Sequence, residues 1–252
     1  MKLFLAMAIT VEAAFNSFYE NINLSGDHRQ TANGRKDDVV DSLRKDFEVL
    51  DAFATGSIPK FTALKGHADL DVMVVLHYGK HIKNKTPTQV LESVQQSLAE
   101  YRTNVRKNGQ AVTLYYKTWP NVDIVPVCRV TNNDGSVNCY EVPNANNGTW
   151  IQARPRKFAN EIEAKAKGCG HNFRRIIKMI KHWNSVHSEF LTGYHIEVLA
   201  LNIFSHNLDD TPWNVLQFFD KARPLLQTSL WHELGFADEY LSYNDRAEVL
   251  KR

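Results

Sequence analysis

The chain has 252 residues, 43% of them hydrophobic, and its 30 basic and 28 acidic residues leave a net charge of +2. This length is enough to bury one sizeable core, or two lobes that share an interface. The near balance of charge argues against a protein that binds nucleic acid over its whole surface, although it is compatible with a local basic cleft.

The first helix is expected to begin after Thr10. The N-terminal sequence MKLFLAMAITVEA has the lysine, short apolar stretch and small residues of a secretory signal. A helix explains it better, because Thr10 can serve as the N-cap, Glu12 suits a first turn, and apolar residues recur at helical spacing at Phe15, Phe18, Tyr19 and Ile22. A second helical stripe is predicted at Val40, Leu43, Phe47 and Leu50.

Strands and one helix are predicted in the middle of the chain. The run LDVMVVLHY (70–78) has the composition of a buried strand, and the stretch 87–105 reads as a helix with Pro87 near its start. Two further strands, 111–119 and 123–130, are separated by a turn at Trp119-Pro120. Asn132-Asn133-Asp134-Gly135 predicts a turn before a short strand at 139–142.

Helices are predicted for the rest of the chain. A loop rich in Asn, Gly and Pro (143–155) precedes a helical stripe made by Phe173, Ile176, Ile177, Ile180 and Trp183. These patterns predict an α+β protein in three parts: N-terminal helices (1–50) that brace both lobes, a mixed α/β lobe (51–150) and a helical lobe (151–252).

The cellular location of the protein can be predicted from its cysteines and from its hydropathy. Cys128, Cys139 and Cys169 are widely spaced and odd in number, without a C-x-x-C pair or the His/Cys spacing of a zinc site, which favours reduced thiols. No apolar run has the length needed to cross a bilayer. We therefore expect a cytoplasmic protein with no membrane partner.

Two carboxylates mark the candidate site. In a strand, residues i and i+2 point to the same face, so Asp69 and Asp71 would project together while Leu70 and Val72 point into the core. Like charges held side by side repel, and burying them unpaired is costly. Divalent cations would reverse that cost, because Mg²⁺ prefers hard oxygen ligands and substrate phosphates.

Three more residues favour a phosphoryl-transfer site at this strand. Gly56 would let the backbone approach a phosphate closely, and Ser57 would add a hydroxyl donor. Asp123 opens a second apolar run, DIVPV, and could complete a two-metal site and help to deprotonate a hydroxyl nucleophile. Taken singly, these features are a solvated strand end, a turn and a strand-capping acid; their joint occurrence is much harder to explain in that way.

The combination resembles the nucleotidyltransferase superfamily with a polymerase-β-type palm. More closely, it is similar to the bacterial CD-NTases, the cyclic-oligonucleotide synthases related to animal cyclic GMP-AMP synthase. The resemblance covers most of the chain and rests on the segments FNSFYENINLS, GS…DLDVMVVL, WPNVDIVPV, RRIIKMIKHWN and GYHIEVLAL. The acids mark only the superfamily, whereas the WP-x-x-D-x-V-P and I-K-x-W-N segments are more specific.

The resemblance implies roles for two residues of the helical lobe. Lys181, two residues before the Trp, is implied to contact the triphosphate of the donor nucleotide, and Tyr194 to stack on a base. Family members often have serine where this chain has Gly193, so that phosphate contact would fall to a backbone amide. They also usually continue with a further helical stretch beyond a segment like EYLSYNDRAEVLKR, where this sequence stops.

The function implied is the joining of nucleoside triphosphates into a cyclic di- or trinucleotide with release of pyrophosphate, as an anti-phage signal. Asp69, Asp71 and Asp123 would hold two Mg²⁺ ions, with Mn²⁺ as the alternative. A downstream effector would sense only the product, and no stable nucleic-acid partner is expected. Two alternatives stay open: a nucleotidyltransferase that modifies tRNA, a protein or a small molecule, and a catalytically silent nucleotide-binding module.

Overall fold

The computed structural model describes residues 10–24, 26–67 and 69–252, so the first nine residues of the signal-like segment lie outside the described residues. The chain divides into two compact units, Leu24–Glu161 and Met1–Asn23 with Ile162–Arg252. Each unit has its own buried hydrophobic residues.

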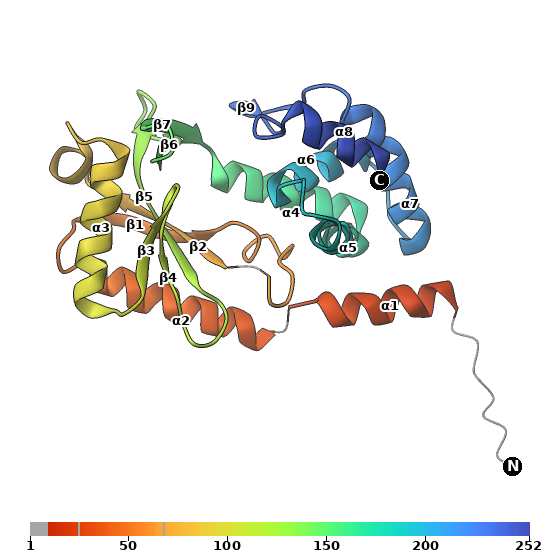
Figure 1. The fold of residues 1–252 in the computed structure, drawn as a ribbon, viewed down its shortest axis with the longest axis horizontal. Helices are drawn as coiled ribbons and strands as arrows, with labels where there is room; N and C mark the ends of the chain where they lie inside the picture. The colour runs from red at the N-terminus through yellow and green to blue at the C-terminus, as the bar shows by residue number, and fades with distance from the viewer. Residues whose placement is uncertain (1–9, 25, 68) are drawn as a thin grey trace, which may run out of the picture. The chain divides into compact units, whose positions relative to one another are not determined.

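The unit Leu24–Glu161 is built on a seven-stranded mixed sheet (Figure 1). Its path is β1-β2-β5-β4-β3, with β6 pairing β5 and β7, and the β2–β5 pair is parallel while the others are antiparallel. The strands are β1 (Val49–Thr55), β2 (Leu70–Leu76), β3 (Val105–Asn108), β4 (Ala111–Leu114), β5 (Val122–Thr131), β6 (Val137–Asn144) and β7 (Thr149–Ala153). The helical elements are α2 (Gly26–Leu43), a π-helical turn η1 (Tyr78–Ile82) and α3 (Pro87–Tyr101).

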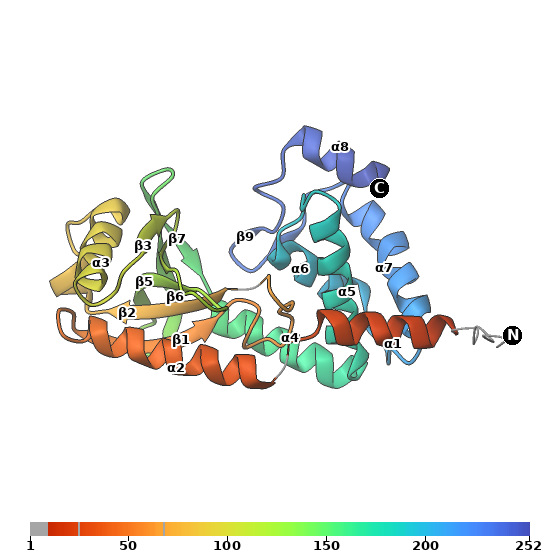
Figure 2. The ribbon, with the colours of Figure 1, turned by 60° about the horizontal axis from the view of Figure 1, so that its bottom comes forward.

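The two faces of this sheet differ in what covers them. Leu70, Val72 and Val74 of β2 pack in one core with buried residues of α2 and α3, and Figure 2 shows α2 running along the sheet. Because side chains alternate along a strand, Met73 and Val75 face the other way and pack in a second cluster with residues of β5 and β6. Asp71 has the same parity as Met73, so it lies on the face opposite α2 and α3.

The other unit is helical. Its elements are α1 (Val11–Ile22), α5 (Asn172–Val186), α6 (Gly193–Ile203), α7 (Thr211–Leu225), α8 (Tyr243–Lys251) and a small hairpin of β8 (Trp231–His232) and β9 (Gly235–Phe236). The boundary between the units falls within α4 (Pro155–Cys169). The predicted stripe is confirmed on α5, where Phe173, Ile176 and Ile177 are fully buried.

Local signals placed several elements correctly. The Thr10 side chain accepts a hydrogen bond from the Ala13 amide at the start of α1, and Thr86 forms a capping box ahead of Pro87 in α3. The strand at Leu70 and the turn around Gly135, which has φ +82°, are also present. Within the described residues, no helix combines the length and the apolar character that crossing a membrane requires.

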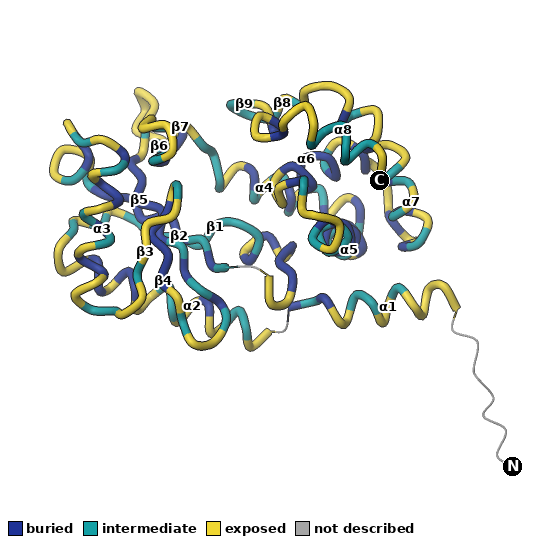
Figure 3. Tube along the Cα trace, in the orientation of Figure 1, coloured by how far each residue is buried: buried dark blue, intermediate teal, exposed yellow. Residues whose placement is uncertain are grey.

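Other predictions of secondary structure were wrong. The second helical stripe stops at Leu43, because the chain leaves the helix there and Leu50 lies in β1, 40% exposed. The predicted helix 87–105 ends at Tyr101, and the predicted strand 111–119 ends at Leu114. Strands were missed at β1, at β3, at β7 within the predicted loop 143–155, and at β8 and β9. All are short or partly exposed, which weakens the periodic signal (Figure 3).

Helices α1 and α2 belong to different compact units, and the boundary between the units in the second half of the chain lies at 161/162. The division into 1–50, 51–150 and 151–252 stays a prediction. That residues 1–50 brace both lobes stays a prediction.

Leu43 and Leu50, which the sequence placed on one helical stripe, differ in burial: Leu43 is fully buried and Leu50 is 40% exposed. Leu43→Ala should lower the free energy of unfolding by about 2–5 kcal/mol, because Leu43 is fully buried in the sheet core. Leu50→Ala should cost about 1 kcal/mol or less, because much of that side chain already contacts water. Urea unfolding of both variants measures the difference, and equal losses would contradict the placement of Leu50 in an exposed strand position.

Candidate active site

The candidate site lies where the parallel strands β2 and β5 begin. In their register Leu70 pairs with Val122 and Asp71 pairs with Asp123, so the two carboxylates leave neighbouring strands on the same face of the sheet. Asp69 is two residues before Asp71 and directly precedes β2. The structure therefore brings Asp71 and Asp123 side by side, with Asp69 at the entrance of the strand.

Gly56 completes the edge of this site from β1. Thr55, the last residue of β1, pairs with Asp71, and Gly56 follows with φ +70°. A Cβ added to Gly56 would lie 1.8 Å from Asp71 Oδ2 and 2.8 Å from its Cγ. Glycine is required here twice: its backbone is left-handed, and the Asp71 carboxylate occupies the space that a side chain would fill.

Ser57 lies in a tight turn that follows Gly56. Its carbonyl accepts a hydrogen bond of 3.0 Å from the Thr62 amide, and the next residue, Ile58, is buried in the core beneath the sheet. The turn is thereby anchored at both of its ends. The backbone at Gly56 passes the Asp71 carboxylate closely. That the turn binds a phosphate stays a prediction.

The charges of the three acids act on one another. Burial and the neighbouring Asp123 raise the pKa of Asp71 to about 6, and Asp69 adds to the rise. The pKa of Asp123 is also raised, mainly by burial and further by Asp69, against a hydrogen bond from Thr113 that lowers it. The protein's own positive groups thus compensate the negative charge of Asp71 and Asp123 poorly, as expected of carboxylates that bind a cation.

Two residues near the acids were missed in the sequence. Thr113 of β4 pairs with Asp123, and its Oγ1 donates to Asp123 Oδ1 at 2.5 Å. Lys60 is buried, with its Nζ 4.3 Å from the centre of the Phe158 ring, and its charge lowers the pKa of Asp71. The alternation of the AVTL strand could have indicated that Thr113 faces the acids, but its pairing with β5 is not visible in the sequence.

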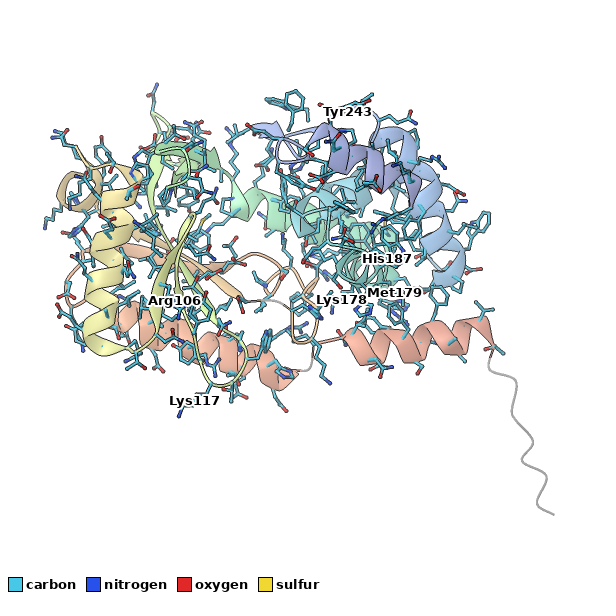
Figure 4. All side chains as sticks on the ribbon, in the orientation of Figure 1. Arg106, Lys117, Lys178, Met179, His187 and Tyr243 are labelled. Carbon is cyan, nitrogen blue, oxygen red and sulfur yellow. The ribbon has the colours of Figure 1, made fainter. Side chains whose placement is uncertain are left out.

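Lys181 belongs to the helical unit, where it is held by a buried acid. Its Nζ lies 2.7 Å from Glu197 Oε1, and the side chains of Lys181 and Glu197 are 11% and 0% exposed. A Cβ on Gly193 would lie 3.3 Å from the Lys181 Cε and Nζ, so the end of the lysine packs against the first residue of α6. Lys181 is therefore not a solvated helix lysine; neighbouring Lys178 and Met179 of α5 are labelled in Figure 4.

Tyr194 lies at the first turn of α6, with 39% of its surface exposed. Its hydroxyl is 2.7 Å from His232 Nδ1, which fixes the direction of the ring. Thr192 caps the helix by accepting from the His195 amide, and the Thr192 amide donates to the Tyr240 hydroxyl at 2.8 Å. The start of α6 is thus a rigid support for one exposed aromatic face.

Of the seven predicted site residues, five lie together in the sheet unit: Gly56, Ser57, Asp69, Asp71 and Asp123. Lys181 and Tyr194 lie in the helical unit. Three carboxylates beside a glycine turn, on the face of the sheet opposite α2 and α3, are a donor set for divalent cations, which can in turn bind phosphates.

Residues 9–166 match the family described as the Second Messenger Oligonucleotide or Dinucleotide Synthetase domain, well over half of the chain. The chain belongs to this family. It is a CD-NTase, a nucleotidyltransferase of the polymerase-β-like superfamily, which confirms the resemblance and the predicted fold class.

Two relatives are similar to the chain in sequence over three quarters of its length or more. The CD-NTase is 22% identical to a probable cyclic nucleotide synthase of Bacillus cereus, over 96% of the chain and 87% of that protein. It is 23% identical to the CBASS oligonucleotide cyclase CdnC of Escherichia coli, over 75% of the chain and 64% of that protein.

Solved structures share the fold. The CD-NTase CdnG of Bradyrhizobium diazoefficiens in complex with GTP superposes with a TM-score of 0.79 at 11% identity, covering 95% of this chain and 87% of that one. Escherichia coli CdnC with ATP gives a TM-score of 0.75 at 16% identity, with coverages of 94% and 87%. At such identities the likeness establishes the fold alone.

Substitutions at two glycines with positive φ distinguish the effect of backbone strain from the effect of a side chain placed against Asp71. Gly56→Ala and Gly66→Ala should each lower the free energy of unfolding by about 1–2 kcal/mol, because φ is +70° and +75°. Only Gly56→Ala should also abolish nucleotide transfer, since its Cβ displaces the Asp71 carboxylate, whereas a Cβ on Gly66 meets no atom within 4 Å. Thermal unfolding and a pyrophosphate-release assay measure both effects, and an active Gly56→Ala enzyme would contradict the close approach.

Proposed function

We propose that this CD-NTase joins nucleoside triphosphates into a cyclic di- or trinucleotide through a divalent-metal-dependent reaction that releases pyrophosphate. The observation that carries the proposal is the register that pairs Asp71 with Asp123 on the face of the sheet opposite α2 and α3. The family to which the chain belongs supports oligonucleotide synthesis as the reaction class.

The residues present fit a divalent cation. Asp71 and Asp123 hold hard oxygen donors on neighbouring strands, and the raised pKa values of both show that their charge is poorly compensated. We assign Asp69, Asp71 and Asp123 as the ligands of two Mg²⁺ ions, with Mn²⁺ as the alternative. When bound, such a pair supplies a clamp for the attacking and leaving oxygens of phosphoryl transfer.

The protein's own groups would orient the nucleotides and move one proton. A 3′-type hydroxyl attacks the α-phosphorus of the donor, the bond to the β-phosphate breaks, and pyrophosphate leaves with the electron pair. Asp123 is our candidate to accept the hydroxyl proton, because Thr113 occupies its Oδ1 and leaves Oδ2 for that task.

The other predicted residues would bind the substrate. The Gly56-Ser57 turn would cradle phosphate with its backbone amides and hydroxyl, and Lys181 would add a positive charge to the triphosphate. Tyr194 would stack on a base, a contact that contributes roughly 1–3 kcal/mol and tolerates any base. A cyclic product would then act as an anti-phage signal that an effector senses.

Triphosphate binding should depend on the acids and the metal together. A nucleoside triphosphate with Mg²⁺ should raise the melting temperature more than the same triphosphate with a chelator, because the metal joins carboxylates to phosphates; saturation at 100 times Kd corresponds to about 2.7 kcal/mol. Asp69→Asn with Asp71→Asn should remove this difference and all turnover. The double variant itself should be at least as stable as the wild type, since it lacks two repelling charges.

Differential scanning fluorimetry with each of the four ribonucleoside triphosphates measures these shifts. Near-wild-type turnover by the double variant would remove Asp69 and Asp71 from the proposed site, and an equal shift in chelator would mean that the triphosphate binds without this acid pair.

The role of Lys181 needs a variant that keeps the fold. Lys181→Ala alone should cost about 3 kcal/mol of stability, because it leaves the carboxylate of Glu197 in the core without the ammonium 2.7 Å away. Lys181→Met with Glu197→Leu should restore much of that stability and still show a reduced triphosphate shift. A full shift in the stable double variant would exclude Lys181 from triphosphate binding.

A further inference from the structure

Arg35 of α2 makes an unusual set of contacts with the loop Tyr115–Asn121 that joins β4 to β5. Its Nη1 donates to the Thr118 carbonyl at 2.7 Å and also to the Pro120 carbonyl, and its Nη2 donates to Thr118 Oγ1 at 2.6 Å. Its guanidinium lies 4.1 Å from the centre of the Tyr116 ring. One side chain thus ties down three residues of the loop, which Lys117 marks in Figure 4.

Asn121 connects this loop to the strand that carries Asp71, through hydrogen bonds to Tyr116 and to Leu70. Asn121 Oδ1 accepts from the Tyr116 amide at 3.1 Å, and its carbonyl accepts from the Leu70 amide at 2.9 Å. Leu70 stands between Asp69 and Asp71, and Asn121 is two residues before Asp123. The bond from Leu70 to Asn121 is therefore where the parallel register of β2 and β5 starts.

Arg35 is well supported for this task. The helix α2 is anchored in the sheet core through Ala32, Val39 and Leu43, all fully buried. The guanidinium is a planar fork whose several donors can serve two carbonyls and a hydroxyl at once, and its stacking on an aromatic ring fixes its plane. A lysine at this position would reach at most part of this set with a single ammonium.

We propose that Arg35 is a positioning residue for the acid site: by holding the loop Tyr115–Asn121 it fixes the start of the β2–β5 pairing and hence the placement of Asp71 against Asp123. The proposal rests on the proposed function only in that the acids bind a metal. Arg35 lies on the helix-covered face of the sheet and acts through the loop, and no contact with substrate is assigned to it.

Two measurements test the proposal, and the first is independent of metal. Backbone amide hydrogen exchange of Leu70 should become at least tenfold faster in Arg35→Gln, because its acceptor carbonyl is no longer held, while the amide of Val74 in the middle of β2 should exchange as in the wild type. The second is Mn²⁺ affinity by titration calorimetry, which should fall about 10- to 100-fold, the range found when residues that orient metal ligands are removed.

Matched variants separate positioning from loss of stability. Arg44→Gln removes an exposed arginine that directly follows α2 and pairs with Asp41. This variant should leave both readouts unchanged. Val39→Ala destabilises α2 from the core without touching the loop, and should leave the ratio of Leu70 to Val74 exchange unchanged. Arg35→Lys keeps the charge but lacks the fork, so it should not rescue Mn²⁺ affinity. If Arg35→Gln fails to fold, Thr118→Val removes one acceptor and should give smaller changes in the same direction.

The outcomes are distinct. If Asp71→Asn binds Mn²⁺ as the wild type does, the metal site itself is refuted and the role of Arg35 falls with it. If Asp71→Asn loses Mn²⁺ while folded Arg35→Gln keeps wild-type affinity, or if Arg35→Lys restores it fully, the metal site stands and the positioning role is wrong. Faster Leu70 exchange together with weaker Mn²⁺ binding in Arg35→Gln, absent from the controls, supports it.

Discussion

The parallel pairing of β2 and β5 is the constraint on which the candidate site depends. It is the one parallel pair among the described strands, and its register sets Asp71 opposite Asp123 on the face away from α2 and α3. A shift by one residue would turn Asp71 toward the apolar core and expose Leu70 in its place. The fully buried residues Leu70, Val72 and Ile124 therefore stabilise the fold and also keep Asp71 and Asp123 on the opposite face of the sheet.

The site is held at a cost in stability. Asp71 and Asp123 carry raised pKa values because they are partly buried and close in space, and the chain must place a glycine with a left-handed backbone beside Asp71. The helical unit also keeps charged side chains out of water, because Lys181 is paired there with the fully buried Glu197. A buried pair of this kind contributes little to stability compared with apolar residues, so its presence favours a functional role for the charge.

The sequence predicted those parts of the site that depend on local rules. The i, i+2 spacing of Asp69 and Asp71, the apolar run after them and the Gly56-Ser57 turn could all be read without a partner strand. The sequence also indicated that the run opened by Asp123 could pair with this strand, but it did not give the parallel direction or the register that sets Asp71 opposite Asp123, because these depend on the order of strands about fifty residues apart. The hold of Arg35 on Thr118, the bond from Thr113 to Asp123 and the strand β1 were missed for the same reason. Each depends on long-range pairing, which no local pattern encodes.

We propose that one acid site forms every phosphodiester bond of the cyclic product, and product identification tests this most directly. The purified protein is incubated with all four ribonucleoside triphosphates and Mg²⁺ or Mn²⁺, treated with phosphatase, and examined by mass spectrometry alongside Asp123→Asn. We expect a phosphatase-resistant cyclic di- or trinucleotide from the wild type, and neither linear nor cyclic product from Asp123→Asn. Only phosphatase-sensitive linear products from the wild type, or an unchanged cyclic product from Asp123→Asn, would contradict it.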